Sequence, residues 1–539
     1  MSETEKNRAG IAGAVMVPHP PLIIPDVGRG EEKGIQATID AYLKASEFVL
    51  SLHPDTIIIS SPHSIMYRDY FHISPGNAAV GNFGQFRAPR VQISAVYDSP
   101  LRDEICKAAD AKGFPTGDLG ERDPSLDHAT MIPLYFLQEA EQMNHGSAAP
   151  FNSETAGLSA SSENGSTAAP VFGSAGTTTF RILRIGLSGL PLPMHYELGQ
   201  MVEKAAIKLG RRIVWIASGD LSHKLKSDGP YGFSKDGPVY DERIMDVMGS
   251  GEFEKLFDFD EAFLESAAEC GHRSFVEMAG AFDGLAVKTQ KLSHEGPFGV
   301  GYGVCTFLTG AHDDSRHCLK NWEERKTSAL QEKRKTEDPY VQLARASVEA
   351  YVRCREELTP EEAENRLYRS SQTMQDTAAV TKKVSANERA LSGKEKLPPE
   401  MYENRAGAFV SIHENGQLRG CIGTISAVQE NIAEEIIENA ISASTRDPRF
   451  KPIRTDELPY LEITVDILGP AERISSPAEL DVKRYGVIVT KGMKRGLLLP
   501  NLDGVDTVPQ QIAIAKQKAG IATDDEDVEL QRFEEVRHY

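Results

Sequence analysis

The chain has 539 residues, of which 40% are hydrophobic and 26% are charged, and its formal net charge is −20 at pH 7. This length exceeds one ordinary core, since single domains usually span roughly 100–200 residues. Nucleic acids and anionic membranes repel a strongly acidic chain, so the charge argues against both as principal partners. The charge by itself is otherwise explained by solubility.

The cysteines are widely spaced and include no CxxC pair, which argues against a disulfide framework and favours a reducing cytoplasm. The six are Cys106, Cys270, Cys305, Cys318, Cys354 and Cys421. The first ten residues are polar, unlike a secretory signal, and no apolar run reaches the ~18–20 residues of a membrane helix. We therefore expect a cytoplasmic protein without a membrane span.

Three polar segments divide the chain. Residues 145–179 are mostly Ser, Ala, Gly and Thr, a composition that buries too little apolar surface to offset ordering, and we expect a flexible surface insertion. Residues 313–338 are crowded with charge and predict an exposed, partly helical linker. Residues 370–397 predict a long loop. The linker separates a first domain, 11–312, from a second, 339–535.

Short runs rich in Ile and Val alternate with helical segments in the first domain, including a helix predicted at 37–52. The predicted buried strands are 13–17 (GAVMV), 55–60 (DTIIIS), 181–187 (RILRIGL) and 212–218 (RIVWIAS). This alternation predicts an α/β domain with a mainly parallel sheet covered by helices. Ligands of such sheets bind beyond the carboxyl ends of the strands.

Histidines follow three of these strands within a few residues. His19, His63 and His223 each lie close to a Pro or Gly that forces a turn, and His128 precedes an apolar helix at 129–140. A single loop histidine is more often only exposed or hydrogen-bonded. Convergence of several at one sheet edge favours a metal site instead, because neutral imidazole is the commonest metal ligand.

Four strings in the first domain carry a family resemblance: VPHPPLIIPDVG, SSPHS, LDHATMIPL and SGDLSH. In this order they resemble the class III extradiol ring-cleavage dioxygenases and the related Memo family, over residues 11–310. The resemblance implies that His19 and His63 are metal ligands. It also implies that His223 is the acid–base residue and that His128 is a second polar group in the pocket.

Asp220, in SGDLSH, has two interpretations of equal weight. It orients or charges the site, or it caps a helix that follows the strand.

The third metal ligand has two candidates in the segment AECGH, Glu269 and Cys270. This segment precedes a helix whose buried face is predicted to carry Phe275, Met278 and Phe282. The dioxygenases use a glutamate here, whereas the Cys-Gly pair resembles the Memo branch. A carboxylate suits Fe(II) and O₂ chemistry, while a thiolate favours more thiophilic metals. We favour Glu269; Glu295, in a glycine-rich turn, is a further candidate.

The resemblance implies a metal-dependent dioxygenase that uses Fe(II), or another divalent metal, to oxidise a small, catechol-like substrate with O₂. His223 would take a proton from the substrate and later return it, a role that suits the pKa of histidine. A scaffold that binds metal or peptide without turnover is the first alternative, and Cys270 as the ligand would favour it. The second alternative is a component of a radical S-adenosylmethionine (SAM) modification system.

The second domain is predicted to be α+β, with a helix at 340–353 and partly alternating strands such as 407–414 and 461–469. Its strings LRGCIG and DPRF resemble the Amme-type domain. A chain that joins both domains resembles the fused AmmeMemoRadiSam system proteins, which implies a radical SAM protein as a partner.

The chemistry of the second domain has two interpretations. Cys421 lies between two glycines, with Arg419 nearby to favour a thiolate, which is consistent with a nucleophile or a small-ligand pocket. A buried cysteine beside a salt-bridged arginine is the more common arrangement. Arg449 either holds an anion or pairs with a nearby carboxylate.

Overall fold

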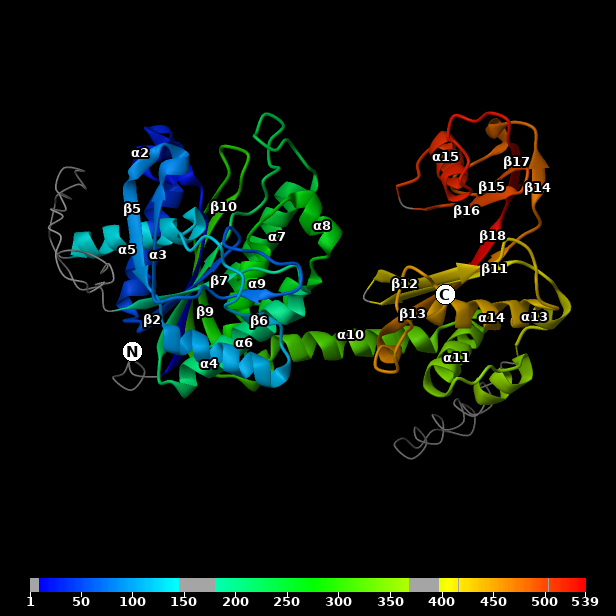
Figure 1. Cartoon of the computed structure of the whole chain (residues 1–539), viewed down its shortest axis with the longest axis horizontal. Helices are drawn as coiled ribbons and strands as arrows, with labels where there is room; N and C mark the ends of the chain where they lie inside the picture. The colour runs from blue at the N-terminus through cyan, green and yellow to red at the C-terminus, as the bar shows by residue number, and fades with distance from the viewer. Residues whose placement is uncertain (1–8, 145–179, 368–396, 415, 503) are drawn as a thin grey trace, which may run out of the picture. The chain divides into compact units, whose positions relative to one another are not determined.

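The computed structural model describes residues 9–144, 180–367 and 397–539, apart from 415 and 503 (Figure 1). It divides the chain into two compact units, Met1–Glu323 and Glu324–Tyr539. The predicted insertion at 145–179 lies outside the described residues, as does nearly all of the predicted loop at 370–397. Helix α10 (Cys318–Lys335) occupies most of the predicted linker.

The first unit is built on a six-stranded sheet with the order β7-β2-β8-β1-β10-β9. In that order the strands are Arg181–Gly186, Thr56–Ser61, Arg212–Ser218, Gly10–Val17, Tyr302–His312 and Leu285–Glu295. The first four are parallel and correspond to the four predicted strands. Strands β10 and β9 form an antiparallel hairpin beside β1, so the sheet is mixed. The exposed polar residues of β9 hide this edge strand from a search for buried apolar runs.

Helices cover both faces of this sheet (Figure 1). Alternate strand residues point to opposite faces, so Met16, Ile58 and Trp215 enter one core cluster, and Val15, Ile57 and Val214 enter the other. The first cluster includes residues of α4 (Ser99–Lys112), α6 (Leu192–Lys208), α7 (Asp236–Ser250), α8 (Glu261–Ala267) and α9 (His272–Ala281). The second includes residues of α3 (Gln36–Ser51) and α5 (His128–Asn144).

The first unit also contains several short helical elements. They are η1 (Pro21–Ile23), α2 (Pro25–Gly28), η2 (Glu31–Ile35), η3 (Gly84–Phe86), η4 (Phe253–Asp258) and η5 (Asp314–Arg316). It also contains two small strand pairs: β3 (Phe71–His72) with β6 (Thr116–Gly117), and β4 (Ala78–Phe83) with β5 (Ala88–Val96).

The second unit contains two four-stranded sheets, with the orders β12-β11-β13-β18 and β14-β17-β15-β16. The first has β12 (Gln417–Gly423), β11 (Ala408–Glu414), β13 (Leu461–Leu468) and β18 (Glu535–His538), and the second has β14 (Glu472–Ile474), β17 (Glu529–Phe533), β15 (Gly486–Lys491) and β16 (Lys494–Leu498). Its helices include α11 (Pro339–Cys354), α13 (Glu400–Glu403), α14 (Ile432–Thr445) and α15 (Val508–Lys518), with η7 (Leu458–Tyr460) and η8 (Pro477–Glu479) between strands. Among the described residues, the strand pairings of both sheets are antiparallel, as expected for an α+β domain.

Among the described residues, no helix has both the length and the apolar character to cross a membrane.

Helix α9 is held close to α6 by two glycines. A Cβ atom on Gly199 of α6 would lie 2.0 Å from the carbonyl oxygen of Glu277, and one on Gly280 of α9 would lie 2.0 Å from that of Tyr196. Both positions must therefore lack a side chain. This close packing sets where the segment just before α9 meets the sheet.

Glu277 of α9 is an unusual member of this interface. Glu277 is fully buried, and neither of its carboxyl oxygens has a hydrogen-bond partner among the described residues. Burial raises the pKa of Glu277 well above its usual value. A carboxyl group that binds its proton more tightly in the folded chain stabilises the fold most at a pH below the unfolded pKa, and this contribution is lost as pH rises.

We predict that Glu277→Met raises the free energy of unfolding, by about 1–3 kcal/mol for removing an unsatisfied buried polar group, and by more at pH 8 than at pH 5. Thermal and denaturant unfolding at both pH values measures this. Glu265→Met, an exposed position on α8, is the control and should change little. An equal gain at both pH values, or none, would contradict the prediction.

Candidate metal centre

His19 lies in a turn that three prolines create just after β1. Pro18, Pro20 and Pro21 have no N–H group, so the chain cannot continue the β ladder. The backbone N–H of His19 instead donates to Oδ1 of Asp220 at 2.7 Å. His19 is 1% exposed, so its ring is fixed within the protein.

The hydrogen bonds behind His19 determine which ring nitrogen carries the proton. The hydroxyl of Ser218, at the end of β8, donates to the carbonyl of Ala129 at 2.8 Å. It therefore accepts from Nδ1–H of His19, 3.0 Å away. Nε2 of His19 is left with a free lone pair, which is the arrangement that metal-binding histidines adopt.

Two further potential metal ligands lie close to Nε2 of His19. Nε2 of His63, in the loop after β2, lies 3.1 Å from Nε2 of His19. Sγ of Cys270, just before α9, lies 3.6 Å from the same nitrogen. One ligand atom from each of His19, His63 and Cys270 lies within 4.8 Å of the others, the only such group of three or more found among the described residues. These atoms are spaced so that one metal ion could contact all three.

Cys270 reaches this position because two backbone segments touch. A Cβ atom on Gly219, after β8, would lie 2.1 Å from Cα of Gly271. The residues beside these glycines are then close enough to bond: the N–H of Asp220 donates to Sγ of Cys270 at 3.3 Å, and the N–H of Cys270 donates to the carbonyl of Asp220 at 3.4 Å.

The geometry does not support our preference for Glu269 over Cys270. The carboxylate of Glu269 accepts the backbone N–H of His272 at 2.6 Å, at the start of α9. An acidic group is favourable at a helix N-terminus, where backbone N–H groups lack partners. Because adjacent side chains diverge, this bond turns Glu269 away and leaves Cys270 with the two histidines. Glu295 is also committed elsewhere, since it accepts from the N–H and hydroxyl of Thr38.

His128, the first residue of α5, borders the same cluster. Its ring centroid lies 4.3 Å from that of His63 and 5.5 Å from that of His19. Asp127 fixes the start of α5 by accepting from the N–H of Thr130 at 3.0 Å and from the Ser61 hydroxyl at 2.7 Å. The loop after β2 and the start of α5 are thus tied together, which brings His63 beside His128.

His223, after β8, is oriented by the carbonyl oxygen of Ala268, which accepts from its Nδ1–H. Nε2 is then the unprotonated nitrogen and is able to accept a proton. The Tyr231 ring packs edge-on against His223, with centroids 5.1 Å apart. Asp220 caps no helix, since the next helix, α7, begins at Asp236. It instead holds the backbone of His19.

The four imidazoles favour the neutral form. Burial lowers the pKa of His19 well below its usual value, and charge on His63, His128 and His223 would lower it further. Burial also lowers the pKa values of His63 and His223, and that of His128 to about 4. Burial raises the pKa of the Cys270 thiol well above its usual value and that of Asp220 to about 7. Neutral imidazoles are ready to bind a cation, and a bound cation would favour the thiolate.

A cavity of about 640 Å³ opens beside His63 and His128. It also touches the β4–β5 hairpin through Val80 and Phe86, and the loop before α5. Glu121 and Arg184 line it as well. Sequence reasoning did not find these two residues, because neither lies in a recognisable motif and Arg184 falls within a run expected only to be a strand.

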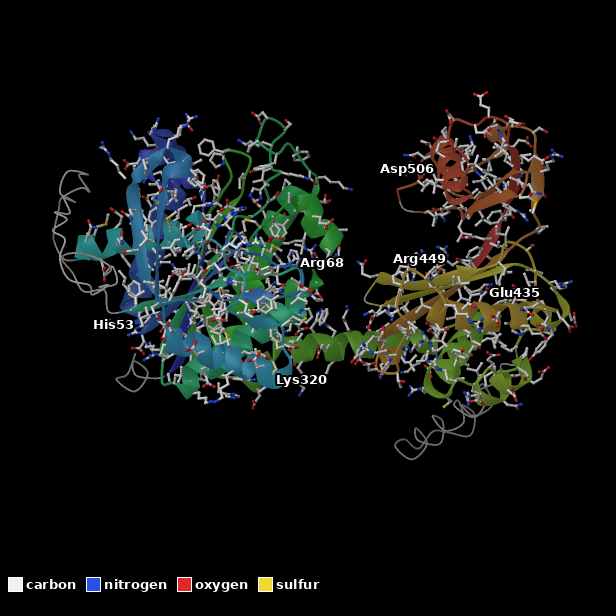
Figure 2. The ribbon with its side chains drawn as sticks, in the orientation of Figure 1. His53, Arg68, Lys320, Glu435, Arg449 and Asp506 are labelled. Carbon is white, nitrogen blue, oxygen red and sulfur yellow. The ribbon has the colours of Figure 1, made fainter. Side chains whose placement is uncertain are left out.

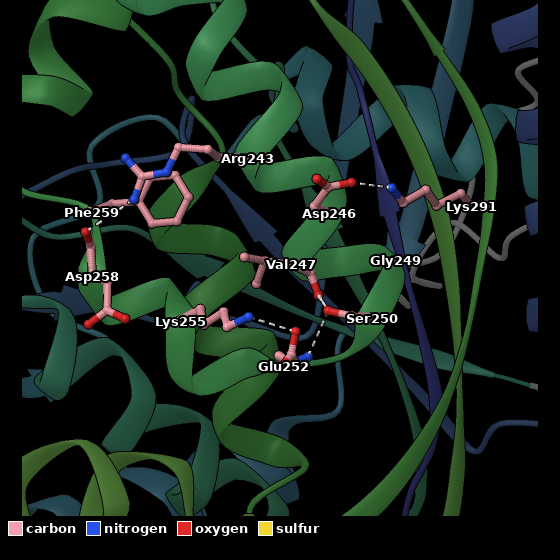
Figure 3. A pocket seen from close by; sticks show the side chains of 10 residues that line it. All are labelled: Arg243, Asp246, Val247, Gly249, Ser250, Glu252, Lys255, Asp258, Phe259 and Lys291. Atoms are coloured by element: carbon pink, nitrogen blue, oxygen red, sulfur yellow. Dashed lines mark hydrogen bonds and ion pairs between the residues drawn. The ribbon is translucent and has the colours of Figure 1, made fainter. Parts of the chain in front are cut away.

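A second cavity of similar volume lies between α7, η4 and β9 (Figure 3). Its charged groups are already paired: Lys291 lies 2.8 Å from Asp246, and Lys255 lies 2.9 Å from Glu252. The Arg243 guanidinium stacks 4.3 Å from the centroid of the Phe259 ring. This cavity contains none of the predicted site residues.

In the second unit, the candidate residues form a network of hydrogen bonds around β12. Arg419 is not directed at the thiol, because its Nε donates to Glu457 at 2.7 Å. Arg449, labelled in Figure 2, donates to Asp447 at 2.7 Å and to the carbonyl of Cys421 at 3.1 Å. Asp447 also accepts the N–H of Cys421 at 2.9 Å. Arg449 is thus the arginine that adjoins Cys421.

Comparison with known proteins assigns both halves of the chain to families. The model of the catalytic LigB subunit of aromatic ring-opening dioxygenase matches residues 13–164 and 173–305. The AMMECR1 model matches residues 341–538.

The same combination extends over a full-length relative. Protein CA_C1420 of Clostridium acetobutylicum is 35% identical over 533 residues, which cover 98% of each chain. A protein of Thermotoga maritima is 54% identical over 145 residues, 27% of this chain and 83% of the relative.

Two solved structures of uncharacterized proteins are also similar. PH0010 from Pyrococcus horikoshii is 28% identical, with a TM-score of 0.29, over 37% of this chain and 88% of that one. JW3007 from Escherichia coli K12 is 12% identical, with a TM-score of 0.33, over 55% and 99%. On the family models and the full-length relative, the chain belongs to the family of the catalytic LigB subunit of aromatic ring-opening dioxygenases and carries an AMMECR1 domain in its second half.

Proposed function

We propose that the first unit is a metal-dependent oxidoreductase that oxidises a small, catechol-like substrate with O₂, and that the second unit is accessory to it. The observation that carries this proposal is the meeting of His19, His63 and Cys270 beside a cavity of about 640 Å³. Membership of the LigB family supports dioxygenase-like chemistry.

The donor set fits a divalent transition metal. Two neutral imidazoles suit Fe(II), the metal that the family resemblance implies, whereas a thiolate as third ligand adds more thiophilic metals to the candidates. A bound metal would supply Lewis-acid and redox chemistry that the side chains lack. Asp220 holds the backbone of His19 and Ser218 holds its ring.

His223 is the group that we assign to proton transfer. Its Nδ1–H is held by the Ala268 carbonyl, so Nε2 takes a proton from a substrate hydroxyl and can return it to the product. His128, kept neutral by burial, is placed to hydrogen-bond the substrate in the cavity.

A scaffold that binds metal or peptide without turnover is a second candidate, and the position of Cys270 is the observation that favours it. A thiolate in place of a carboxylate departs from the two-histidine, one-carboxylate set of non-haem Fe(II) oxygenases. Metal binding without O₂ consumption would identify this case.

We further propose that a radical SAM protein is a partner of this chain. We also propose that the chain acts in the cytoplasm and that it binds neither nucleic acid nor membrane. The joining of LigB-type and AMMECR1 units in one chain supports a place in a multi-component system. Full activity of the purified chain alone would argue against the need for this partner.

We predict that the chain binds about one Fe(II) per molecule under anaerobic conditions, and that His19→Ala and Cys270→Ala lose this ion. Each loss should exceed the roughly 10–100-fold change in affinity that follows removal of a hydrogen bond behind a ligand. Equilibrium dialysis with elemental analysis, repeated with Zn(II), measures it.

The matched controls for this experiment are Glu269→Gln and Cys106→Ala. Both should keep the metal, since Glu269 bonds to the start of α9 and Cys106 lies on α4. Metal retained by Cys270→Ala and lost by Glu269→Gln would instead restore Glu269 as the third ligand.

We predict that His223→Ala retains its metal but lowers the rate of O₂ consumption with 4-ethylcatechol by roughly 10²–10⁴-fold, the usual contribution of a general base. An oxygen electrode measures the rate. His312→Ala, an exposed histidine at the end of β10, should match the wild type. Unchanged turnover in His223→Ala would exclude His223 as an essential base.

A further inference from the structure

A buried ion pair lines the cavity beside the candidate metal centre. Glu121 follows β6 and Arg184 lies on β7, and each side chain is only 2% exposed. Both belong to the lining of the cavity that includes His63 and His128. None of the steps assigned above uses this pair.

The hydrogen bonds of the pair leave one oxygen without a partner. Arg184 donates from Nε to the Ser74 hydroxyl at 2.6 Å, from Nη1 to the Ser125 carbonyl at 2.8 Å, and from Nη2 to Oε1 of Glu121. The Ser74 hydroxyl also donates to Oε1 at 3.3 Å. Oε2 of Glu121 has no hydrogen-bond partner among the described residues, although it is buried. Leaving a buried carboxylate oxygen without a hydrogen bond is energetically costly, so a ligand that donates a hydrogen bond to it would bind more tightly.

The charge of the cavity lining indicates what kind of hydrogen-bond donor would suit Oε2 of Glu121. The lining contains three carboxylates, Glu121, Asp123 and Asp127, and a single guanidinium, that of Arg184. Arg184 is shared, since its Nη1 also lies 3.5 Å from Asp127. The lining therefore carries excess negative charge, which attracts a cation and repels an anion.

The remaining walls favour an apolar or aromatic body. Ile65, Val80, Phe86 and Leu126 line the cavity. The Phe86 ring packs edge-on against His128, with centroids 5.2 Å apart. A flat ring can occupy such a space while its polar ends face the histidines and the carboxylate.

We propose that the ligand of this cavity carries a cationic nitrogen, as an amine or guanidine, on an aromatic or apolar body, and that Oε2 of Glu121 accepts its hydrogen bond. This inference rests on the proposed function in treating the cavity as the substrate site. Glu121 is then the residue that selects aminated substrates over carboxylated ones.

The test compares three probes on the metal-free full-length chain by isothermal titration calorimetry: 2-phenylethylamine, 2-phenylethanol and phenylacetate. The amine should bind roughly 10–100-fold more tightly than the alcohol, as expected for a charge-assisted hydrogen bond. Phenylacetate should bind more weakly than either. This comparison of probes on the wild type requires no variant to fold.

Variants then test whether Glu121 causes the preference for the amine over the alcohol. Glu121→Gln should reduce the preference for the amine over the alcohol to within about threefold, with alcohol affinity unchanged. Glu121→Asp keeps the charge that pairs with Arg184 but withdraws the oxygen, and should weaken amine binding. Asp123→Asn removes the same unit of charge from an exposed residue whose carboxylate bonds to Ser125, and should have a smaller effect. Thermal unfolding verifies that each variant is folded.

No amine binding, no preference for the amine in the wild type, or an unaltered preference in a folded Glu121→Gln, would each overturn the inference. A separate titration of the metal-loaded chain with 4-ethylcatechol tests the proposed function. Failure to bind this catechol, with the amine preference intact, would reject the catechol-like substrate and leave the role of Glu121 standing.

Discussion

The contact between Gly219 and Gly271 is the constraint on which the candidate metal centre depends. No Cβ atom fits at Gly219, because it would lie 2.1 Å from the backbone of Gly271. This approach places Asp220 against Cys270, and Asp220 in turn holds the backbone of His19. The close packing of α6 on α9 through Gly199 and Gly280 holds helix α9, which begins directly after Gly271. The relative positions of the candidate ligands are thus set by backbone packing and not by their side chains alone.

Burial gives the centre its chemical character. Desolvation disfavours charge on every imidazole in the group, so the site holds neutral nitrogen donors at neutral pH. The same desolvation raises the pKa of the Cys270 thiol well above its usual value. The adjoining cavity differs, because its carboxylates outnumber its single guanidinium. The neutral imidazoles thus lie on one side of the site and the excess of carboxylates on the other, and the two proposals made above rest on this contrast.

The second unit has a different organisation around its own cysteine. Asp447 accepts from both the Cys421 N–H and Arg449, and the Arg449 pair lowers the pKa of Asp447 to about 2. Asp447 and Arg449 thus form an ion pair beside Cys421, and the Ser411 hydroxyl contacts the thiol sulfur at 3.3 Å. The network holds the backbone of Cys421, and a nucleophilic role of its thiol stays a prediction.

The sequence by itself determined the strands of the parallel part of the sheet, the turns that follow them and the residues that those turns carry. Buried apolar runs and Pro or Gly punctuation are local signals, so His19, His63 and His223 could be assigned to one sheet edge. Only the tertiary structure could favour Cys270 over Glu269, because adjacent residues have the same position in any sequence pattern. Cys270 is favoured by the hydrogen bond of Glu269 to the start of α9 and by the contact between two glycines far apart in the chain. The Glu121–Arg184 pair also required the fold, since a loop and a strand must meet in space before an unpartnered carboxylate oxygen can be recognised.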